Sequence, residues 1–166
     1  FYHAVPVAVA LIVFGIAFII IERWNKGRKP KIRTVDDLTV SAVLIIGVFQ
    51  LLAAVFPGTS RSGATIVGAL LIGVSRKAAS EFTFFLAVPV MLGASLLKVL
   101  KYGFAFSGSE LLVLGVGMVT AFFVSIVVIR FLMDYIKKHD FQAFGWYRIA
   151  LGIVVLIGSM VGLVQV

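Results

Sequence analysis

The stretch Gln50-Leu-Leu-Ala-Ala-Val-Phe-Pro57-Gly58-Thr59-Ser60-Arg61-Ser62-Gly63-Ala-Thr65 places glycines, hydroxyls and a guanidinium between two apolar runs that have the composition of membrane helices. An arginine near the centre of a bilayer costs roughly 2.5–3.5 kcal/mol on insertion scales, so a protein that keeps one there generally uses it. Irregular backbone at that depth is tolerated only where protein covers it or a water-filled cavity hydrates it. We therefore interpret this stretch as the functional site.

The composition predicts an all-α integral membrane protein with a single transmembrane domain over residues 1–166. Hydrophobic residues make up 61% of the chain and charged residues 13%, against about 45–50% and about 25% in soluble domains. The chain has no cysteine, which excludes disulfides and thiolate metal sites. Its formal charge is +8, but the basic residues flank apolar runs, where membrane topology and anionic headgroups explain them. The expected partner is the bilayer, and nucleic acid is excluded.

Four apolar runs are predicted to span a hydrocarbon core of about 30 Å. They cover residues 2–21, 82–97, 110–133 and 146–164. Pro89 is expected to kink the second of them.

The connections between these runs carry most of the charge. The most basic loop, residues 22–33, is placed in the cytoplasm by the positive-inside rule, with an anionic-lipid patch as the alternative. Residues 34–37 contain helix-starting Thr and Asp residues. Residues 98–109 are predicted to form a short loop, and residues 134–140 a basic one.

Residues 39–74 are predicted to form a re-entrant helix–loop–helix. The apolar run after the polar loop, residues 64–74, has only about 11 residues, or roughly 16 Å of helix, which is too short to cross. If this hairpin returns to its side of origin, the basic groups at 22–33, 76–77 and 137–138 share one side of the membrane. The alternative is two ordinary spans joined by a short loop.

The polar loop has the chemistry of a phosphate site. Gly58 and Gly63 allow a ligand to approach the backbone closely. Ser62 is predicted to cap a helix that begins near Ala64, so that the positive end of its dipole faces the loop. Arg61 adds a planar fork suited to phosphate oxygens. The alternative is a Gly/Ser-rich break in a transporter helix, with Arg61 paired to a buried acid.

The motif Pro57–Thr65 closely resembles the signature of the undecaprenyl-pyrophosphate phosphatases, the bacitracin-resistance family. The resemblance continues through Gly73-Val-Ser-Arg-Lys-Ala-Ala79, Glu81-Phe-Thr-Phe-Phe-Leu-Ala-Val-Pro89 and Phe144-Gly-Trp-Tyr-Arg148, and it includes Gln50. It implies a multi-pass enzyme of the bacterial plasma membrane that dephosphorylates undecaprenyl pyrophosphate and so recycles the lipid carrier for cell-wall synthesis. It also implies a fold of inverted repeats, each with a re-entrant hairpin.

The resemblance also implies roles for the loop residues. Ser60, Arg61 and Thr65 match the residues that carry activity in the family. Arg61 would clamp the pyrophosphate, and Ser60 would be a nucleophile or a hydrogen-bond donor. The remaining expected substrate-binding residues are Gly58, Thr59, Ser62, Gly63 and Gln50.

The chain departs from the family by lacking its first-half motifs. The family carries a Glu-x-x-x-Glu motif, or its Gln variant, and a second Ser-rich loop that ends in His, and neither occurs here. We therefore expect the chain to be the carboxy-terminal half of a longer enzyme. The divalent cation that the family implies, Mg²⁺ or Ca²⁺, would find its carboxylate partners elsewhere. His3 and His139 are not expected to act as the base.

Three further residues have two interpretations each. Gln50 either hydrogen-bonds the loop or does not reach it. Glu81 either reaches the site or is a helix-end carboxylate. Arg148 either lines the cavity or reaches the membrane interface.

Two other functions remain open. One is a translocase of phosphorylated lipid carriers, since broken helices and inverted repeats are also transporter architecture. The other is an inactive fragment that lacks the acid/base half. The sequence leaves a homodimer open as well.

Overall fold

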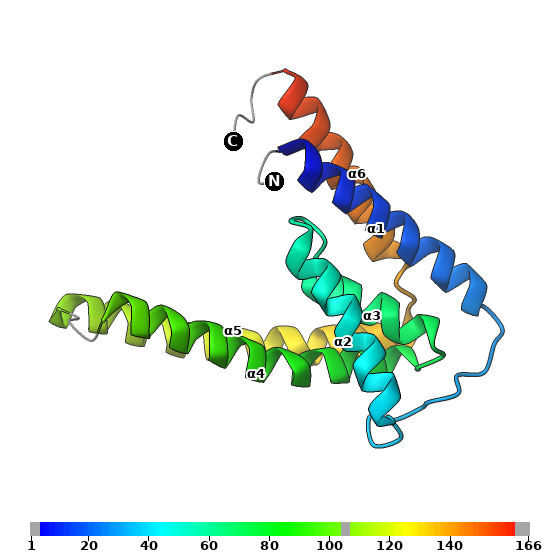
Figure 1. Cartoon of the computed structure of the whole chain (residues 1–166), viewed down its shortest axis with the longest axis horizontal. Helices are drawn as coiled ribbons and strands as arrows, with labels where there is room; N and C mark the ends of the chain where they lie inside the picture. Colours follow the sequence, from blue (N-terminus) through cyan, green and yellow to red (C-terminus); the bar gives the residue numbers. More distant parts are fainter. Residues whose placement is uncertain (1–3, 104–106, 162–166) are drawn as a thin grey trace. The chain divides into compact units, whose positions relative to one another are not determined.

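The computed structural model describes residues 4–103 and 107–161, which are helical apart from their connections and one isolated bridge. Six helices lie in these ranges: α1 Ala4–Asn25, α2 Val40–Val55, α3 Arg61–Leu71, α4 Arg76–Tyr102, α5 Gly108–Lys138 and α6 Gln142–Met160 (Figure 1). Four of them, α1, α4, α5 and α6, are long and apolar enough to cross a membrane. The prediction of an all-α membrane protein with four spans and one helix–loop–helix is therefore confirmed.

The helices run further than the apolar runs predicted. Helix α1 continues to Asn25, α4 to Tyr102 and α5 to Lys138. The residues at the start of each predicted loop, 22–33, 98–109 and 134–140, are therefore helical. Hydropathy marks only the part of a helix that sits in hydrocarbon. Backbone hydrogen bonding continues into the more polar flanks, and α4 also continues through Pro89.

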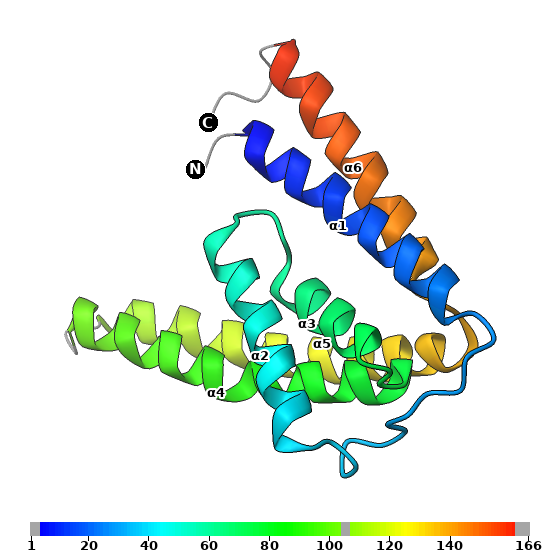
Figure 2. The same ribbon diagram turned by 45° about the vertical axis from the view of Figure 1, so that its right-hand side comes forward.

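One structural unit contains the described residues within 1–83 and 139–166, and within it α1 and α6 pack side by side along their length (Figures 1 and 2). Glycines bring their backbones together. A Cβ added to Gly15 would lie 2.8 Å from the carbonyl oxygen of Gly145, and one added to Gly152 would lie 2.9 Å from that of Ala8. Small residues that let helix backbones approach are typical of packing inside membranes.

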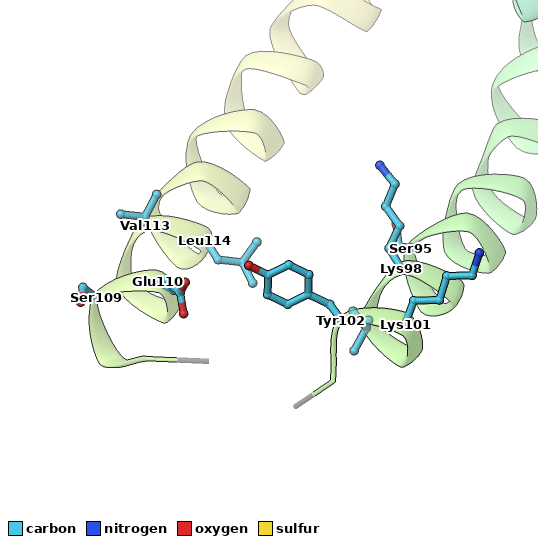
Figure 3. A pocket seen from close by; sticks show the side chains of 9 residues that line it. Ser95, Lys98, Lys101, Tyr102, Ser109, Glu110, Val113 and Leu114 are labelled. Atoms are coloured by element: carbon cyan, nitrogen blue, oxygen red, sulfur yellow. The ribbon is translucent and has the colours of Figure 1, made fainter. Parts of the chain in front are cut away.

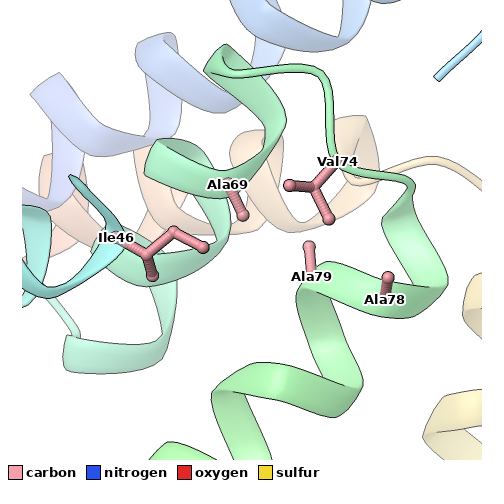
Figure 4. Packing of buried hydrophobic residues seen from close by; sticks show 5 residues of the cluster. All are labelled: Ile46, Ala69, Val74, Ala78 and Ala79. Carbon is pink, nitrogen blue, oxygen red and sulfur yellow. The ribbon is translucent and has the colours of Figure 1, made fainter. Parts of the chain in front are cut away.

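In the same unit, α2 and α3 form the predicted helix–loop–helix (Figure 2). A cluster of buried apolar side chains ties the hairpin to the α3–α4 connection and the first turn of α4 (Figure 4). Its members are Ile46, Ala69, Val74, Ala78 and Ala79. Helices α2 and α3 have 16 and 11 residues, so neither reaches the length of a typical span. Re-entry into a bilayer stays a prediction.

The basic loop is fixed to the end of this hairpin. The backbone N–H groups of Lys31 and Ile32 donate to the carbonyl of Gly73, at 2.9 and 3.3 Å, and Ser75 N–H returns a bond of 2.8 Å to Ile32. Asn25 donates to the last-turn carbonyl of Leu70 at 3.0 Å. Two of the basic segments, 22–33 and 76–77, are thus adjacent.

The start of α2 lies later than the sequence predicted. Thr39 is the N-cap, and its side chain accepts from the N–H of Ala42. Thr34 and Asp37 instead form a turn, in which the hydroxyl and N–H of Thr34 donate to the carboxylate of Asp37 at 2.7 and 3.2 Å. The hydroxyl bond is the main reason that the pKa of Asp37 is lowered. Asp37 therefore stabilises a turn before α2 rather than the first turn of α2.

The second unit, residues 84–138, contains most of α4 and all of α5. Its large apolar side chains are mostly exposed, as expected of helices that face lipid. A cavity of about 880 Å³ lies between the joined ends of the two helices and includes Lys98, Tyr102, Glu110 and Leu114 in its lining (Figure 3). None of the predicted site residues lines it.

Candidate active site

The polar loop begins where α2 ends, and it packs against α1. The N–H of the C-cap residue Phe56 donates to Leu52 at 3.0 Å, and a turn closes when the N–H of Thr59 donates to Phe56 at 3.3 Å. Gly58 has φ +89°, and a Cβ there would lie 2.7 Å from the carbonyl oxygen of Val7. Both the dihedral angle and the close approach require glycine at this position.

Ser60, not Ser62, is the N-cap of α3. The N–H of Gly63 donates to the Oγ of Ser60 at 3.2 Å, and the helix starts at Arg61, three residues before the predicted start at Ala64. Ser62 lies in the first turn, with its Oγ 3.2 Å from that of Ser60. Both serines are exposed.

The backbone of Ser60 is strained. Its φ of +34° makes it the one non-glycine residue with positive φ in the part of the chain that the structure describes. Such conformations cost of order 1–3 kcal/mol and persist only where the surroundings impose them. The strain therefore coincides with the residue that the sequence analysis placed at the centre of the chemistry.

The first turn of α3 faces the loop as an anion site would. Ala64 N–H donates to the carbonyl of Ser60 at 3.0 Å, whereas the hydrogen bonds of the described residues leave the N–H groups of Arg61 and Ser62 without an acceptor. Such N–H groups at the positive end of a helix dipole attract phosphate oxygens.

Arg61 is half-buried at the start of α3, and none of the described carboxylates forms an ion pair with it. The alternative interpretation of the loop paired this arginine with a buried acid. The buried acid that the structure shows, Glu22, pairs with Arg76 instead. The guanidinium of Arg61 is therefore available to an anionic ligand.

Thr65 lies further inside. Its side chain is fully buried, and its hydroxyl lies 2.9 Å from the carbonyl of Ser62 and 3.0 Å from the hydroxyl of Thr83 on α4. The Thr83 hydroxyl in turn donates to Ala79 at 2.7 Å. These bonds join α3 to α4 directly behind the loop. A direct role for Thr65 in chemistry stays a prediction.

Arg148 of α6 reaches the loop, which the sequence analysis left open. Its side chain is buried, and its Nη2 donates to the carbonyl oxygen of Gly58 at 3.1 Å. Beside it, Thr59 is also buried, and the Oγ1 of Thr59 and the Nε of Arg148 have no hydrogen-bond partner among the described residues. Arg148 is thus buried against the loop rather than exposed at the membrane interface.

The remaining candidates lie outside this cluster. Gln50 is part-buried on α2, and among the described residues it forms no hydrogen bond to the loop. Glu81 lies near the start of α4 and pairs with Lys77 at 3.7 Å, as the helix-end interpretation predicts. His139 is exposed between α5 and α6, and His3 lies outside the described residues.

The acidic side chains of the described chain do not form a metal site. No group of three or more His, Cys, Asp or Glu side chains comes together in residues 4–103 and 107–161. Glu22, the most buried carboxylate, is already occupied by Arg76 and by the N–H of Phe141. The residues present therefore do not fit the divalent cation that the resemblance implies.

Glu22 is a key residue that the sequence analysis missed, because it placed this carboxylate in a solvated loop. Both of its oxygens accept from Nε of Arg76 at 3.0 Å, and one accepts from the N–H of Phe141 at 3.1 Å. It connects α1 to the starts of α4 and α6. No local signal marks such a contact, since its partners are 54 and 119 residues away.

The chain is similar in sequence to several proteins named undecaprenyl-diphosphatase. The undecaprenyl-diphosphatase of Desulfitobacterium hafniense is 62% identical over 157 residues, which are 95% of this chain and 56% of that protein. Undecaprenyl-diphosphatase 1 of Clostridium acetobutylicum is 61% identical over 95% of the chain and 57% of its own length. An undecaprenyl-diphosphatase of Enterococcus faecalis is 62% identical over 92% and 55%.

The chain thus spans a little over half the length of the curated relatives it matches. The family model described as bacitracin resistance protein BacA matches residues 1–154. That range contains the loop, the cap at Ser60 and Arg148 on α6. With most of its length matched by this model, and with four helices able to span a membrane, the chain belongs to the BacA bacitracin resistance family of multi-pass bacterial membrane proteins.

Proposed function

We propose that the protein containing this chain removes the terminal phosphate from undecaprenyl pyrophosphate and releases undecaprenyl phosphate. This reaction would recycle the lipid carrier for cell-wall synthesis and give bacitracin resistance. One observation carries the proposal: at the N-terminus of α3, the exposed residue Ser60 is adjacent to Arg61, which forms no ion pair among the described residues. The names of the matched relatives support the same activity.

The loop residues have different proposed roles, which follow from their functional groups. The fork of Arg61 binds two phosphate oxygens, and the open N–H groups of the first turn of α3 bind others. Ser60 either donates a hydrogen bond to the phosphate while water attacks the terminal phosphorus, or it attacks that phosphorus itself. In the second case its proton passes to a base, undecaprenyl phosphate leaves with the bridging oxygen, and water then hydrolyses the phosphoserine to release phosphate. A serine nucleophile needs a base. Among the described residues no carboxylate or imidazole bonds Ser60, so that base would come from another part of the protein.

The cation and the assembly are part of the proposal. A divalent cation, Mg²⁺ or Ca²⁺, would take its carboxylates from outside the described residues, since these hold no cluster of ligands. A homodimer in the bilayer is the proposed assembly to be tested by crosslinking in native membranes, and no nucleic acid partner is expected.

Substitution of Arg61 in the full protein tests the function. In proteoliposomes, Arg61→Ala should lower phosphate release from undecaprenyl pyrophosphate by about 100-fold or more, as for loss of one transition-state donor. Arg61→Lys should recover only part of it, because an ammonium cannot bind two oxygens in one plane. Arg33→Ala, an exposed arginine of the basic loop, is the matched control and should leave the rate unchanged. Wild-type activity in Arg61→Ala would refute the assigned role.

The translocase alternative gives a different result in the same vesicles. It predicts that the lipid carrier crosses the bilayer while no phosphate appears. If the wild type releases phosphate and Arg61→Ala does not, the translocase alternative is contradicted.

A further inference from the structure

Arg148 contacts the loop on both sides of the reactive pair. Its Nη2 donates to the carbonyl of Gly58, two residues before Ser60. A Cβ at Gly63, two residues after Arg61, would lie 2.7 Å from its Nη1. The guanidinium of Arg148 therefore contacts both ends of the segment that contains Ser60 and Arg61. It fits there because Gly63 has no side chain.

The conformation of Ser60 needs such an external restraint. A serine with φ +34° is strained, and strain of this kind relaxes unless the flanking residues are fixed. The Gly58 side is fixed by Arg148 and by the close approach to Val7, and the Gly63 side by the N–H bond to Ser60 and by contact with the guanidinium.

The burial of Arg148 also needs an explanation. Arg148 is 8% exposed, its Nε has no hydrogen-bond partner among the described residues, and it forms no ion pair with any of them. Burial of a cation without a carboxylate is unfavourable, because the charge loses its hydration and gains no opposite charge. A hydrophobic residue would pack α6 at lower cost, so packing alone does not account for an arginine here.

We propose that Arg148 is a positioning residue for the lipid-pyrophosphate reaction: it holds Gly58–Gly63 in the strained conformation that presents Ser60 and Arg61 to the substrate. The inference rests on the proposed function and extends it to α6. Arg148 affects the reaction by holding the loop and does not itself contact the substrate. Its guanidinium fits beside the loop because Gly63 lacks a side chain.

The test is a double-mutant cycle in the full protein, reconstituted in proteoliposomes with undecaprenyl pyrophosphate. Arg148→Met should lower kcat by about 100-fold, the scale of a misplacement near 1 Å, and change KM much less. Arg148→Lys, which can keep the bond to Gly58, should lie between. Gly63→Ala should also lower kcat, because its Cβ displaces the guanidinium.

The double variant decides between positioning and packing. In the Arg148→Met background the methyl group of Gly63→Ala meets no guanidinium, so its effect on kcat should largely vanish. Arg33→Met is the control for loss of an arginine. If Arg148→Met fails to fold, Gly63→Ala still tests the idea, since it keeps the arginine and only displaces it.

The outcomes separate the two proposals. A wild type that releases no phosphate refutes the proposed function. An active wild type with unchanged kcat in Arg148→Met, or in a folded Gly63→Ala, overturns the positioning role. If the fold-losses in kcat of the two single variants multiply in the double variant, the two substitutions act independently. The contact between Arg148 and Gly63 is then not the cause of either loss.

Discussion

Removal of the Glu22 carboxylate should loosen the junction of α1 with the starts of α4 and α6. The side chain is 1% exposed, and it accepts bonds from Nε and Nη2 of Arg76 and from the N–H of Phe141. Glu22→Ala therefore leaves a buried backbone donor unsatisfied and one cation unpaired. Glu22→Gln keeps an oxygen acceptor of the same shape but loses the charge.

The structure sets the size of the effect. Breaking a buried ion pair from one side costs typically 3–5 kcal/mol. The side chain of Arg76 is 42% exposed, so water can rehydrate its charge, and we expect the lower end, about 3 kcal/mol. Of this, about 1–3 kcal/mol is the unsatisfied N–H of Phe141. Glu22→Gln should cost less, because its amide oxygen can still accept from that N–H.

The Lys77–Glu81 pair provides a matched control. It is an i,i+4 pair at 3.7 Å with both side chains partly exposed, so Glu81→Ala should cost only about 0.3–0.5 kcal/mol. Unfolding of the full protein by sodium dodecyl sulfate in mixed micelles, followed by the fluorescence of Trp24 and Trp146, measures both. If Glu22→Ala and Glu81→Ala lower the free energy of unfolding equally, the buried network does not stabilise the fold as argued.

Two further predictions concern the loop and its proposed cation. Ser60→Ala removes the cap and keeps a Cβ at φ +34°, so it should lower the free energy of unfolding by about 1 kcal/mol, whereas Ser60→Gly should lower it by only a few tenths. Phosphate release should fall in both variants. If Ser60→Gly melts at a lower temperature than Ser60→Ala, the backbone of Ser60 is not strained as argued. Chelation with EDTA should stop phosphate release, and added Mg²⁺ or Ca²⁺ should restore it; release that continues in EDTA would exclude the cation.

The fold was largely predictable because the bilayer imposes simple rules. Apolar runs of sufficient length form spans, and a run of 11 residues after a polar loop cannot. These rules located α1, α4, α5, α6 and the α2–α3 hairpin. They failed at helix ends, where hydropathy falls before the backbone stops being helical. They also failed at Glu22, since a carboxylate after an apolar run resembles an interfacial residue until the distant Arg76 is placed beside it.

The loop shows why the site was only partly predictable. Its residue types, namely glycines, hydroxyls and an arginine, indicated phosphate chemistry without any structure. The choice of cap did not follow, because local rules favour a serine in ordinary extended backbone, and Ser62 satisfied them as well as Ser60.

The structure selects Ser60 in a left-handed conformation that local preference assigns to glycine. Local rules are expected to fail where tertiary contacts impose strain, and such places are often functional. The contacts that impose it here come from Val7 on α1 and Arg148 on α6, which are distant in sequence from the loop. Neither residue carries a local signal of that task. The conformation of the loop is therefore a property of the packed α1–α6 pair as much as of the motif itself.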